Sequence, residues 1–411
     1  MFSYTLISKM QYFFHTITKE EFFTQESLYA KKANSEPIVI GIPRENIPLE
    51  PRLPFTPEGV RILFDAGYEV IVETGAGDGI NYSDQQYSEA GAFISDNKSV
   101  VFSADVLFKI APPTIEEAML LKERATIFSM LRLDLHSVEC FRVLQKKKIT
   151  ALAYDFLKDE NQQFSVVNSI CEIEGNVAIS VISELMSNLN GGKGILLGGI
   201  AGVSPTEIII LGAGIAGIVA AKIALSMGCS VILFDNNVNN LRQAQQQLGS
   251  AVFTSVFHPR TLSNALASAD AVIGCLCHLN DGKRYLVSED ALKTMKKGAV
   301  IVDISVAQGG CFETSTITTP EKPYYVRNGV IHCCLPNLSA RVARTASIAM
   351  SNILTNEMIQ VRNNGGIAIS IKKRTGFCNG IYLYNGILTN AHIGSFFGIA
   401  HNDINLLLTA F

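Results

Sequence analysis

The stretch from Glu207 to Asp235 constrains the fold of this chain more than any other part of the sequence. It opens with a short apolar run, Ile208 to Leu211, which is typical of a strand buried on both faces. Three glycines follow in the spacing G-x-G-x-x-G, at Gly212, Gly214 and Gly217. A strand that ends in these glycines predicts a tight turn, a close approach of backbone N–H groups to a pyrophosphate, and close packing of the next helix.

The residues after the glycines complete a dinucleotide-binding unit. Residues 215–227 contain no Pro and suit a helix that Gly228 ends, and its N-terminus would face the phosphates with its partial positive charge. A second apolar run, 231–234, ends in Asp235, 18 residues after Gly217. An acid at this position binds the adenosine ribose hydroxyls and repels a 2′-phosphate, so the sequence predicts NAD rather than NADP.

Length and charge restrict the class of protein. The 411 residues, 48% of them hydrophobic, are too many for a typical single core, so we expect two domains. A net charge of −3 and the lack of a long basic run give no reason to expect nucleic acid as a partner, and small-molecule chemistry is favoured. The uncharged stretch 208–221 is shorter than the about 20 residues of a membrane span, so no span is predicted.

Cysteine usage and the N-terminus bear on the compartment. Nine cysteines, an odd number scattered through apolar segments, favour reduced thiols and a cytoplasmic location. Residues 1–35 contain no uninterrupted apolar region with a cleavage site, so we predict an N-terminal extension, partly helical, and no signal peptide.

Helical patterns alternate with short apolar runs along the rest of the chain. A helix is expected to begin at Pro57 after the capping residue Thr56, and two long helices are expected at 169–189 and 340–360. The glycine-rich loop 73–84 is expected to be exposed. Further strands are expected at 37–42, 68–73, 104–110, 128–133, 150–154, 252–256, 271–275 and 299–304. The alternation predicts an α/β chain with two Rossmann-like domains, each with a parallel sheet, and a cleft between them.

Six blocks of sequence, in order, resemble the L-alanine dehydrogenase family. They read IGIPRENIPLEPRLPFTPEGV, VETGAG, LFKIAPP, GGKGILLGGIAGVSPTEIIILGAGIAG, KKGAVIVDISVAQGGCFETS and LPNLSARVARTAS. The related NAD(H)-binding subunit of proton-translocating transhydrogenase shares several of them. The resemblance implies a substrate domain from residues 36–168 and 341–411, a central NAD-binding Rossmann domain at 169–340, and a homo-hexamer.

The resemblance also implies where the substrate binds. Arg52 matches a family arginine that pairs with the substrate carboxylate, and Lys109 matches a lysine that contacts the same substrate. A small amino acid or 2-oxo acid offers little besides its carboxylate, which a guanidinium holds through two parallel bonds. By spacing alone, Lys109 is more typical of an exposed lysine at a strand end.

Three further residues are candidates for the cofactor site. Asn337 matches a family asparagine near the nicotinamide, and Cys171 takes the place of a serine near the phosphates. Arg242, seven residues past Asp235, either reaches the adenosine side or is a solvated helix arginine.

Two residues depart from the family pattern. Arg132 stands where the family has an acid/base histidine, and Ala307 stands where it has an aspartate. Oxidative deamination removes protons from the amine and activates water, and neither Arg nor Ala does this near neutral pH. Asp303 is close by in sequence but is more typical of a structural strand end. His136, one turn past Arg132, either swings in or is an exposed histidine at a helix start.

Clusters of Cys and His raise the alternative of a metal site. They are Cys275-x-Cys277-His278 and His332-Cys333-Cys334. Neighbours on a strand point to opposite faces, so buried thiols are favoured over zinc and no metal is predicted.

The leading hypothesis is an NAD-dependent oxidoreductase, similar to alanine dehydrogenase, that deaminates L-alanine or a similar small L-amino acid to pyruvate and ammonia. Arg52, Lys109 and Arg132 form its candidate catalytic set. One alternative is a transhydrogenase NAD(H)-binding subunit, which needs no acid/base pair of its own. The stretch LKDENQQFSVVNSI is too short to hold the Arg, Gln and Asp loop of that subunit. The other alternative, a non-catalytic NAD-binding protein, explains both departures.

Overall fold

The computed structural model describes residues 37–45, 50–276 and 286–410. The predicted N-terminal extension at 1–35 lies outside the described residues, as do Cys277 and His278.

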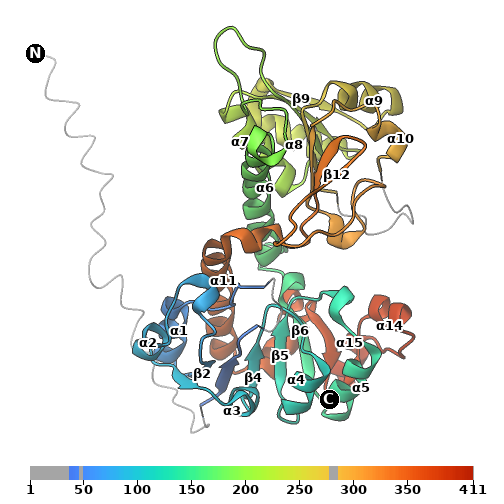
Figure 1. Cartoon of the computed structure of the whole chain (residues 1–411). Helices are drawn as coiled ribbons and strands as arrows, with labels where there is room; N and C mark the ends of the chain where they lie inside the picture. Colours follow the sequence, from blue (N-terminus) through green and yellow to red (C-terminus); the bar gives the residue numbers. More distant parts are fainter. Residues whose placement is uncertain (1–36, 46–49, 277–285, 411) are drawn as a thin grey trace, which may run out of the picture. The chain divides into compact units, whose positions relative to one another are not determined.

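The first sheet has eight strands in the order β15-β14-β6-β5-β4-β1-β2-β3 (Figure 1). Its strands are β1 (Val39–Ile42), β2 (Glu69–Glu73), β3 (Phe93–Ser95), β4 (Val106–Phe108), β5 (Thr126–Ser129), β6 (Thr150–Ala153), β14 (Ile381–Tyr384) and β15 (Ile387–Leu388). Strands β1 to β6 pair in parallel, whereas β14 is antiparallel to β6 and to β15. The sheet therefore takes strands from both ends of the chain.

The second sheet has seven strands in the order β12-β13-β11-β10-β7-β8-β9. Its strands are β7 (Glu207–Leu211), β8 (Ser230–Phe234), β9 (Val252–Ser255), β10 (Ala271–Gly274), β11 (Val300–Asp303), β12 (Tyr325–Arg327) and β13 (Val330–Cys333). All pairs are parallel except β12 with β13. The α/β prediction with two largely parallel sheets is confirmed. We did not predict the antiparallel strands, which are β14 and β15 in the first sheet and β12 in the second.

Helices join and cover the strands. The α-helices are α1 (Pro57–Asp65), α2 (Asp84–Glu89), α3 (Lys98–Phe102), α4 (Ile115–Leu120), α5 (Val138–Lys146), α6 (Ser165–Leu185), α7 (Ile215–Ser226), α8 (Val238–Leu248), α9 (Pro259–Ser268), α10 (Glu289–Leu292), α11 (Ala343–Asn363), α12 (Ile367–Lys373), α13 (Thr375–Cys378), α14 (Ala391–Phe397) and α15 (Ile404–Ala410). Short 3-10 helices are η2 (Asp78–Ile80), η3 (Leu133–Leu135), η4 (Tyr154–Phe156), η5 (Asn188–Asn190), η6 (Gly249–Ala251), η7 (Val306–Gln308) and η8 (Leu338–Val342). As predicted, Thr56 caps α1 and Pro57 is its first residue.

Helix α6 begins and ends four residues earlier than predicted. Among the described residues, it is the helix that by length and composition could cross a membrane. It packs against α7, α11 and η8, however, and its buried apolar side chains belong to the two main cores. We therefore interpret α6 as a core helix.

The prediction that loop 73–84 is exposed is wrong for part of the loop, because Ala76, Ile80 and Tyr82 are buried. The guanidinium of Arg344, from α11, stacks 4.0 Å from the Tyr82 ring and donates to the Ile80 carbonyl oxygen at 2.9 Å. A Cβ at Gly77 would lie 2.3 Å from the Tyr82 carbonyl oxygen, so the glycine lets the loop fold onto itself.

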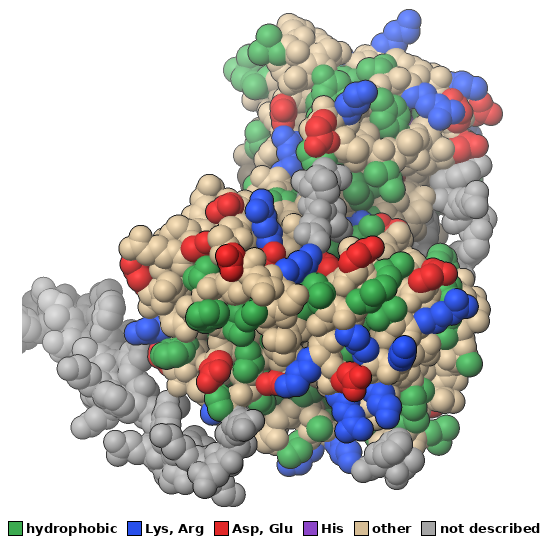
Figure 2. All heavy atoms as spheres, turned by 60° about the horizontal axis from the view of Figure 1, so that its bottom comes forward, with side chains coloured by type: hydrophobic (Ala, Val, Ile, Leu, Met, Phe, Trp, Pro, Cys, Tyr) green, Lys and Arg blue, Asp and Glu red, His purple; other side chains and the backbone are tan. Residues whose placement is uncertain are grey.

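Charges on the surface are mixed. On the face seen in Figure 2, acidic and basic side chains alternate with apolar ones and no large area carries a single sign. This mixture matches the small net charge of the chain.

Candidate active site

The segment that carries Arg52 is tied to helix α11. The Leu53 backbone N–H donates to Ser347 Oγ at 2.9 Å, and the Thr56 N–H donates to Ser351 Oγ at 3.1 Å. Both serines lie on α11 and are buried. Because the backbone on the C-terminal side of Arg52 is fixed at two points, its side chain starts from a defined position.

Arg52 is buried and held by Glu50. Its Nε and Nη2 donate to the two Glu50 carboxylate oxygens, each at 2.7 Å, in a two-bond fork. Burial alone would lower the pKa of Arg52, but the Glu50 carboxylate outweighs burial and the pKa is raised. Nη2 also faces Met130 Sδ at 3.9 Å, and a thioether sulfur is a weak acceptor. The end of the guanidinium therefore keeps capacity for a stronger acceptor such as a carboxylate.

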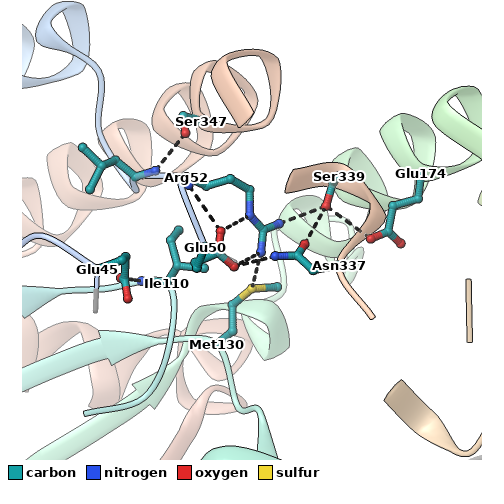
Figure 3. A network of polar contacts seen from close by, with 10 residues as sticks. Glu45, Glu50, Arg52, Ile110, Met130, Glu174, Asn337, Ser339 and Ser347 are labelled. Atoms are coloured by element: carbon teal, nitrogen blue, oxygen red, sulfur yellow. Dashed lines mark hydrogen bonds and ion pairs between the residues drawn. The ribbon is translucent and has the colours of Figure 1, made fainter. Parts of the chain in front are cut away.

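Three residues from distant parts of the chain continue this network (Figure 3). Arg52 Nη1 donates to Ser339 Oγ at 3.0 Å, and Asn337 Nδ2 donates to Glu50 Oε2 at 2.6 Å. The Ser339 hydroxyl lies 3.2 Å from both Asn337 Oδ1 and Glu174 Oε1. The structure thus joins the predicted carboxylate-binding Arg52 to Asn337, the residue predicted near the nicotinamide.

Glu174, which sequence reasoning missed, comes from α6. Its side chain is partly accessible, yet enough protein surrounds the carboxyl group that desolvation raises its pKa to about 7, against the opposing effects of Arg52 and Ser339. The sequence contained one signal that could have identified Glu174, which is a glutamate within a largely apolar predicted helix. An acid in such a place needs a polar partner.

Lys109 is buried, with 1% of its surface exposed, so the alternative of an exposed strand-end lysine is wrong. Its Nζ lies 3.3 Å from Glu45 Oε2 and 3.4 Å from Glu117 Oε1. Burial would lower the pKa of Lys109, but the two carboxylates raise it. The lysine therefore stays charged at neutral pH.

Several of these residues follow the carboxyl ends of parallel strands. Glu45 follows β1, Lys109 follows β4, Met130 follows β5 and Tyr154 follows β6. Ligands of α/β sheets bind at this edge. The Tyr154 hydroxyl is buried and has no hydrogen-bond partner among the described residues, so a polar ligand would satisfy it.

Asp155 supports the same edge. Both of its carboxylate oxygens lie 3.2 Å from the Leu131 backbone N–H, which fixes the turn after β5. Burial raises the pKa of Asp155 to about 7.

Arg132 lies outside strand β5, because the strand ends at Ser129 and not at the predicted residue 133. Its Nε and Nη2 donate to Asp134 at 2.9 and 2.7 Å, so its hydrogen bonds in the described structure do not involve the Arg52 network. Among the described residues, no hydrogen bond or ion pair joins Arg132 to Arg52 or Lys109, the other two members of the candidate catalytic set.

His136 is buried, so the alternative of an exposed helix-start histidine is wrong. Its ring stacks 4.9 Å from Phe141 and meets Tyr382 edge-on at 5.7 Å. In the described part of the chain, neither ring nitrogen has a hydrogen-bond partner. Burial lowers the pKa of His136 to about 4, against the effect of Asp134, and the imidazole is neutral.

Ala307 lies in η7 and is exposed. Asp303, at the end of β11, is buried and accepts from the Ser305 and Cys311 backbone N–H groups at 3.1 and 2.8 Å and from Ser315 Oγ at 2.5 Å. Asp303 thus holds a turn, as we expected of a structural strand end.

The glycine loop between β7 and α7 has the geometry that a dinucleotide requires. Gly212 has a φ of +116°, and a Cβ at Gly217 would lie 1.9 Å from the Gly212 carbonyl oxygen. A Cβ at Gly214 would meet no atom within 4 Å, so open space lies at the N-terminus of α7. Asp235 follows β8, and its Oδ2 accepts from the Ala213 N–H at 2.8 Å, which places the acid beside the loop. These residues fit a bound dinucleotide.

The other proposed cofactor residues are less constrained. Cys171 lies on α6, one turn before Glu174, and is partly exposed. Arg242 lies on α8, is exposed, and donates to Asn239 Oδ1 at 2.8 Å. Their roles at the cofactor stay predictions.

The ring nitrogens of His332 are both engaged within the protein. Nε2 lies 2.8 Å from Thr314 Oγ1, and Nδ1 lies 3.0 Å from the Val330 carbonyl oxygen. His332 and Cys333 both lie in β13 and are buried. This histidine is a core residue.

Comparisons with known proteins identify the family of the chain. The family described as alanine dehydrogenase/PNT matches through its N-terminal domain at residues 41–174 and its C-terminal domain at residues 178–391. The chain is 34% identical over 366 residues to alanine dehydrogenase 2 of Staphylococcus aureus strain USA300, covering 89% of this chain and 98% of that protein. It is 35% identical over 366 residues to alanine dehydrogenase of Staphylococcus epidermidis, with the same coverage.

Solved structures give the same result. A structure of L-alanine dehydrogenase superimposes with a TM-score of 0.82 and 30% sequence identity, covering 88% of this chain and 99% of that one. A transhydrogenase from Sinorhizobium meliloti superimposes with a TM-score of 0.73 at 22% identity, covering 86% of this chain and 99% of that one, and this likeness shows the fold alone. The chain belongs to the alanine dehydrogenase/PNT family.

Proposed function

We propose that this protein is an NAD-dependent dehydrogenase that interconverts L-alanine, or a similar small L-amino acid, with its 2-oxo acid and ammonia. The observation that carries the proposal is the Arg52 guanidinium, which Glu50 fixes on one edge and whose end faces the Ser339 hydroxyl group and the weak acceptor Met130 Sδ. The similarity to alanine dehydrogenases over most of the chain supports it.

Arg52 and Lys109 have different tasks in this proposal. Arg52 holds the substrate carboxylate through its end N–H groups, because Glu50 already occupies the other edge. Lys109 shares its charge between Glu45 and Glu117, so it supplies a hydrogen-bond donor with little net positive charge. These roles suit a small substrate that is recognised through its carboxylate.

NAD, when bound, supplies the acceptor for the hydride of the substrate. The glycine loop would hold its pyrophosphate through backbone N–H groups at the start of α7, and Asp235 would hold the adenosine ribose. Asn337, joined to Glu50 and Ser339, would place the nicotinamide beside the carboxylate held by Arg52.

Turnover by an arginine variant tests the proposal. Purified protein with L-alanine and NAD at alkaline pH should form NADH. Arg52→Lys replaces the planar guanidinium, which forms two parallel hydrogen bonds with a carboxylate, by a single ammonium group. We therefore expect kcat/KM for the amino acid to fall by roughly 10 to 100-fold while NAD binding is unchanged. Arg61→Lys is the matched control, because Arg61 is exposed on α1 and pairs only loosely with Asp65 at 3.6 Å. NAD binding without NADH formation from any small L-amino acid would refute the proposal.

A second candidate is a non-catalytic NAD-binding protein. It is favoured by Arg132, which is paired with Asp134, and by Ala307, which is exposed and carries no proton-transfer group. The double variant Arg132→His with Ala307→Asp separates the two, because only an enzyme that has recently lost activity should gain turnover from it.

We also propose that the protein is a homo-oligomer, a hexamer by the family resemblance, and that it is cytoplasmic, as its scattered cysteines indicate. Light scattering of the purified chain during size-exclusion chromatography measures the number of copies. A monomer at micromolar concentration would contradict this proposal.

A further inference from the structure

Deamination of an amino acid requires a proton acceptor, and the family positions do not supply one in this chain. Arg132 is paired with Asp134, and Ala307 has no ionisable group. Any acceptor must therefore come from other residues near Arg52. This inference rests on the function proposed above and concerns the same site.

Glu174 has the required position. Its Oε1 lies 3.2 Å from Ser339 Oγ, which lies 3.0 Å from Arg52 Nη1, so its carboxyl group is no farther from the guanidinium than two hydrogen bonds. An α-amino nitrogen is three bonds from its carboxylate oxygens. A substrate whose carboxylate binds the end of Arg52 and whose amino group points toward Ser339 would bring that amino group near Glu174. The partial exposure of Glu174 leaves it open to a ligand.

We propose that Glu174 accepts the proton that the substrate ammonium loses during oxidation. The ammonium N–H bond breaks and its proton moves to the Glu174 carboxylate. The nitrogen lone pair then forms a C=N bond as the α C–H bond breaks, and the hydride passes to the nicotinamide of NAD. Water adds to the iminium carbon and the nitrogen leaves as ammonium, giving the 2-oxo acid. Glu174 returns its proton to solvent, so one amino acid, one NAD and one water give one 2-oxo acid, one NADH, one ammonium and one proton.

The other carboxyl groups near Arg52 either pair with a buried cation or use both oxygens on one backbone N–H. Glu50 is bound in the fork with Arg52, and Glu45 pairs with Lys109 and accepts from the Ile110 N–H at 2.5 Å. Asp155 receives the Leu131 N–H on both oxygens. Glu174 accepts from the Ser339 hydroxyl group, which also lies within reach of Asn337 Oδ1, and from the Ser339 backbone N–H. Protonation of Glu174 therefore leaves the ion pairs of Arg52 with Glu50 and of Lys109 with Glu45 in place.

The ionisation of Glu174 suits this role. Desolvation raises its pKa to about 7, so the carboxylate form becomes available as pH rises through neutrality. A base is most effective when its pKa lies near the working pH.

The test compares Glu174→Gln with Glu174→Asp and with Glu172→Gln, a control at an exposed glutamate on the same helix. The full-length proteins are assayed for NADH formation from L-alanine and NAD between about pH 6 and about pH 10. We expect kcat of wild type to fall as pH drops below about 7, and kcat of Glu174→Gln to be at least about 100-fold lower with little change in KM and without that ionisation. Glu174→Asp should recover part of kcat, and Glu172→Gln should match wild type.

Melting temperature and NAD affinity are measured for every variant, because they report a purely structural role. A Glu174→Gln variant with a wild-type kcat and pH profile overturns the inference. Loss of kcat with an unchanged pH profile and no recovery in Glu174→Asp overturns it as well. If wild type turns over no small L-amino acid, the proposed function and this inference both fail, whereas an active wild type with an unaffected Glu174→Gln variant overturns the inference alone.

Discussion

Two buried cations, Arg52 and Lys109, are the main candidates for binding a substrate at this site. Arg52 and Lys109 are each 1 to 2% exposed and each is bound to carboxylates of the chain itself. The carboxylates offset the cost of burying the cations and fix their direction. Sequence reasoning identified the two cations but none of their partners, because Glu50, Glu45 and Glu117 look like ordinary surface acids in the sequence.

Glu50 can be tested for this positioning role. Glu50→Gln leaves Arg52 buried without a full counter-charge, so we expect the free energy of unfolding to fall by on the order of 3 kcal/mol and KM for the amino acid to rise. Denaturant unfolding and initial-rate kinetics measure the two effects. Glu69→Gln, at an exposed position in β2, is the control. An unchanged unfolding midpoint and KM in Glu50→Gln would show that Arg52 needs no partner.

His136 should make stability depend on pH. Its pKa in the folded chain is lowered to about 4, so between that value and the ordinary value of 6.5 the unfolded chain binds a proton that the folded chain does not. Stability is therefore fully present above about pH 6.5 and falls as pH drops toward 4, by about 2 to 3 kcal/mol.

The variant His136→Phe removes this loss. Phe suits the stack on Phe141 and leaves no ring nitrogen without a partner, so we expect stability at neutral pH to be equal or higher and the acid-dependent decrease to be smaller. His392→Phe, at an exposed position, is the control. Unfolding measured across this pH range would contradict the account if His136→Phe kept the slope of wild type.

At the scale of elements, the β7-α7-β8 unit was predicted to within a residue at most ends. Local signals suffice there, because an apolar strand, three glycines and a helix without Pro are contiguous in sequence. Strands β14 and β15 were missed although Asn385 and Gly386, both with positive φ, form the two-residue turn between them. The Asn-Gly pair was a readable hairpin signal.

Substitution by alanine should have different effects at Gly214 and Gly217, the second and third glycines of the loop. Gly217→Ala places a Cβ 1.9 Å from the Gly212 carbonyl oxygen, so we expect α7 to shift from β7 and the melting temperature to fall. Gly214→Ala meets no protein atom within 4 Å, so the fold should stay intact while NAD affinity falls, because the new methyl group enters the space of the pyrophosphate. Calorimetric titration with NAD and thermal melting separate the effects. Equal loss of stability in both variants would contradict a ligand role for the space at Gly214.

At the scale of the whole molecule, the site unites residues far apart in sequence. Glu50, Glu174 and Asn337 come from three segments and meet around one guanidinium (Figure 3). The family resemblance indicated Arg52 and Asn337 separately, but not that a hydroxyl and a carboxyl group would connect them. Such a network depends on how α6 and η8 pack, which no local pattern records.

The central claim, that Arg52 holds a substrate carboxylate beside NAD, is tested most directly by a crystal structure of the full chain with NADH and pyruvate. We expect a pyruvate carboxylate oxygen within about 3 Å of an end nitrogen of Arg52, with the Glu50 fork retained. Pyruvate bound elsewhere, with the end of the guanidinium still facing Met130, would contradict the account.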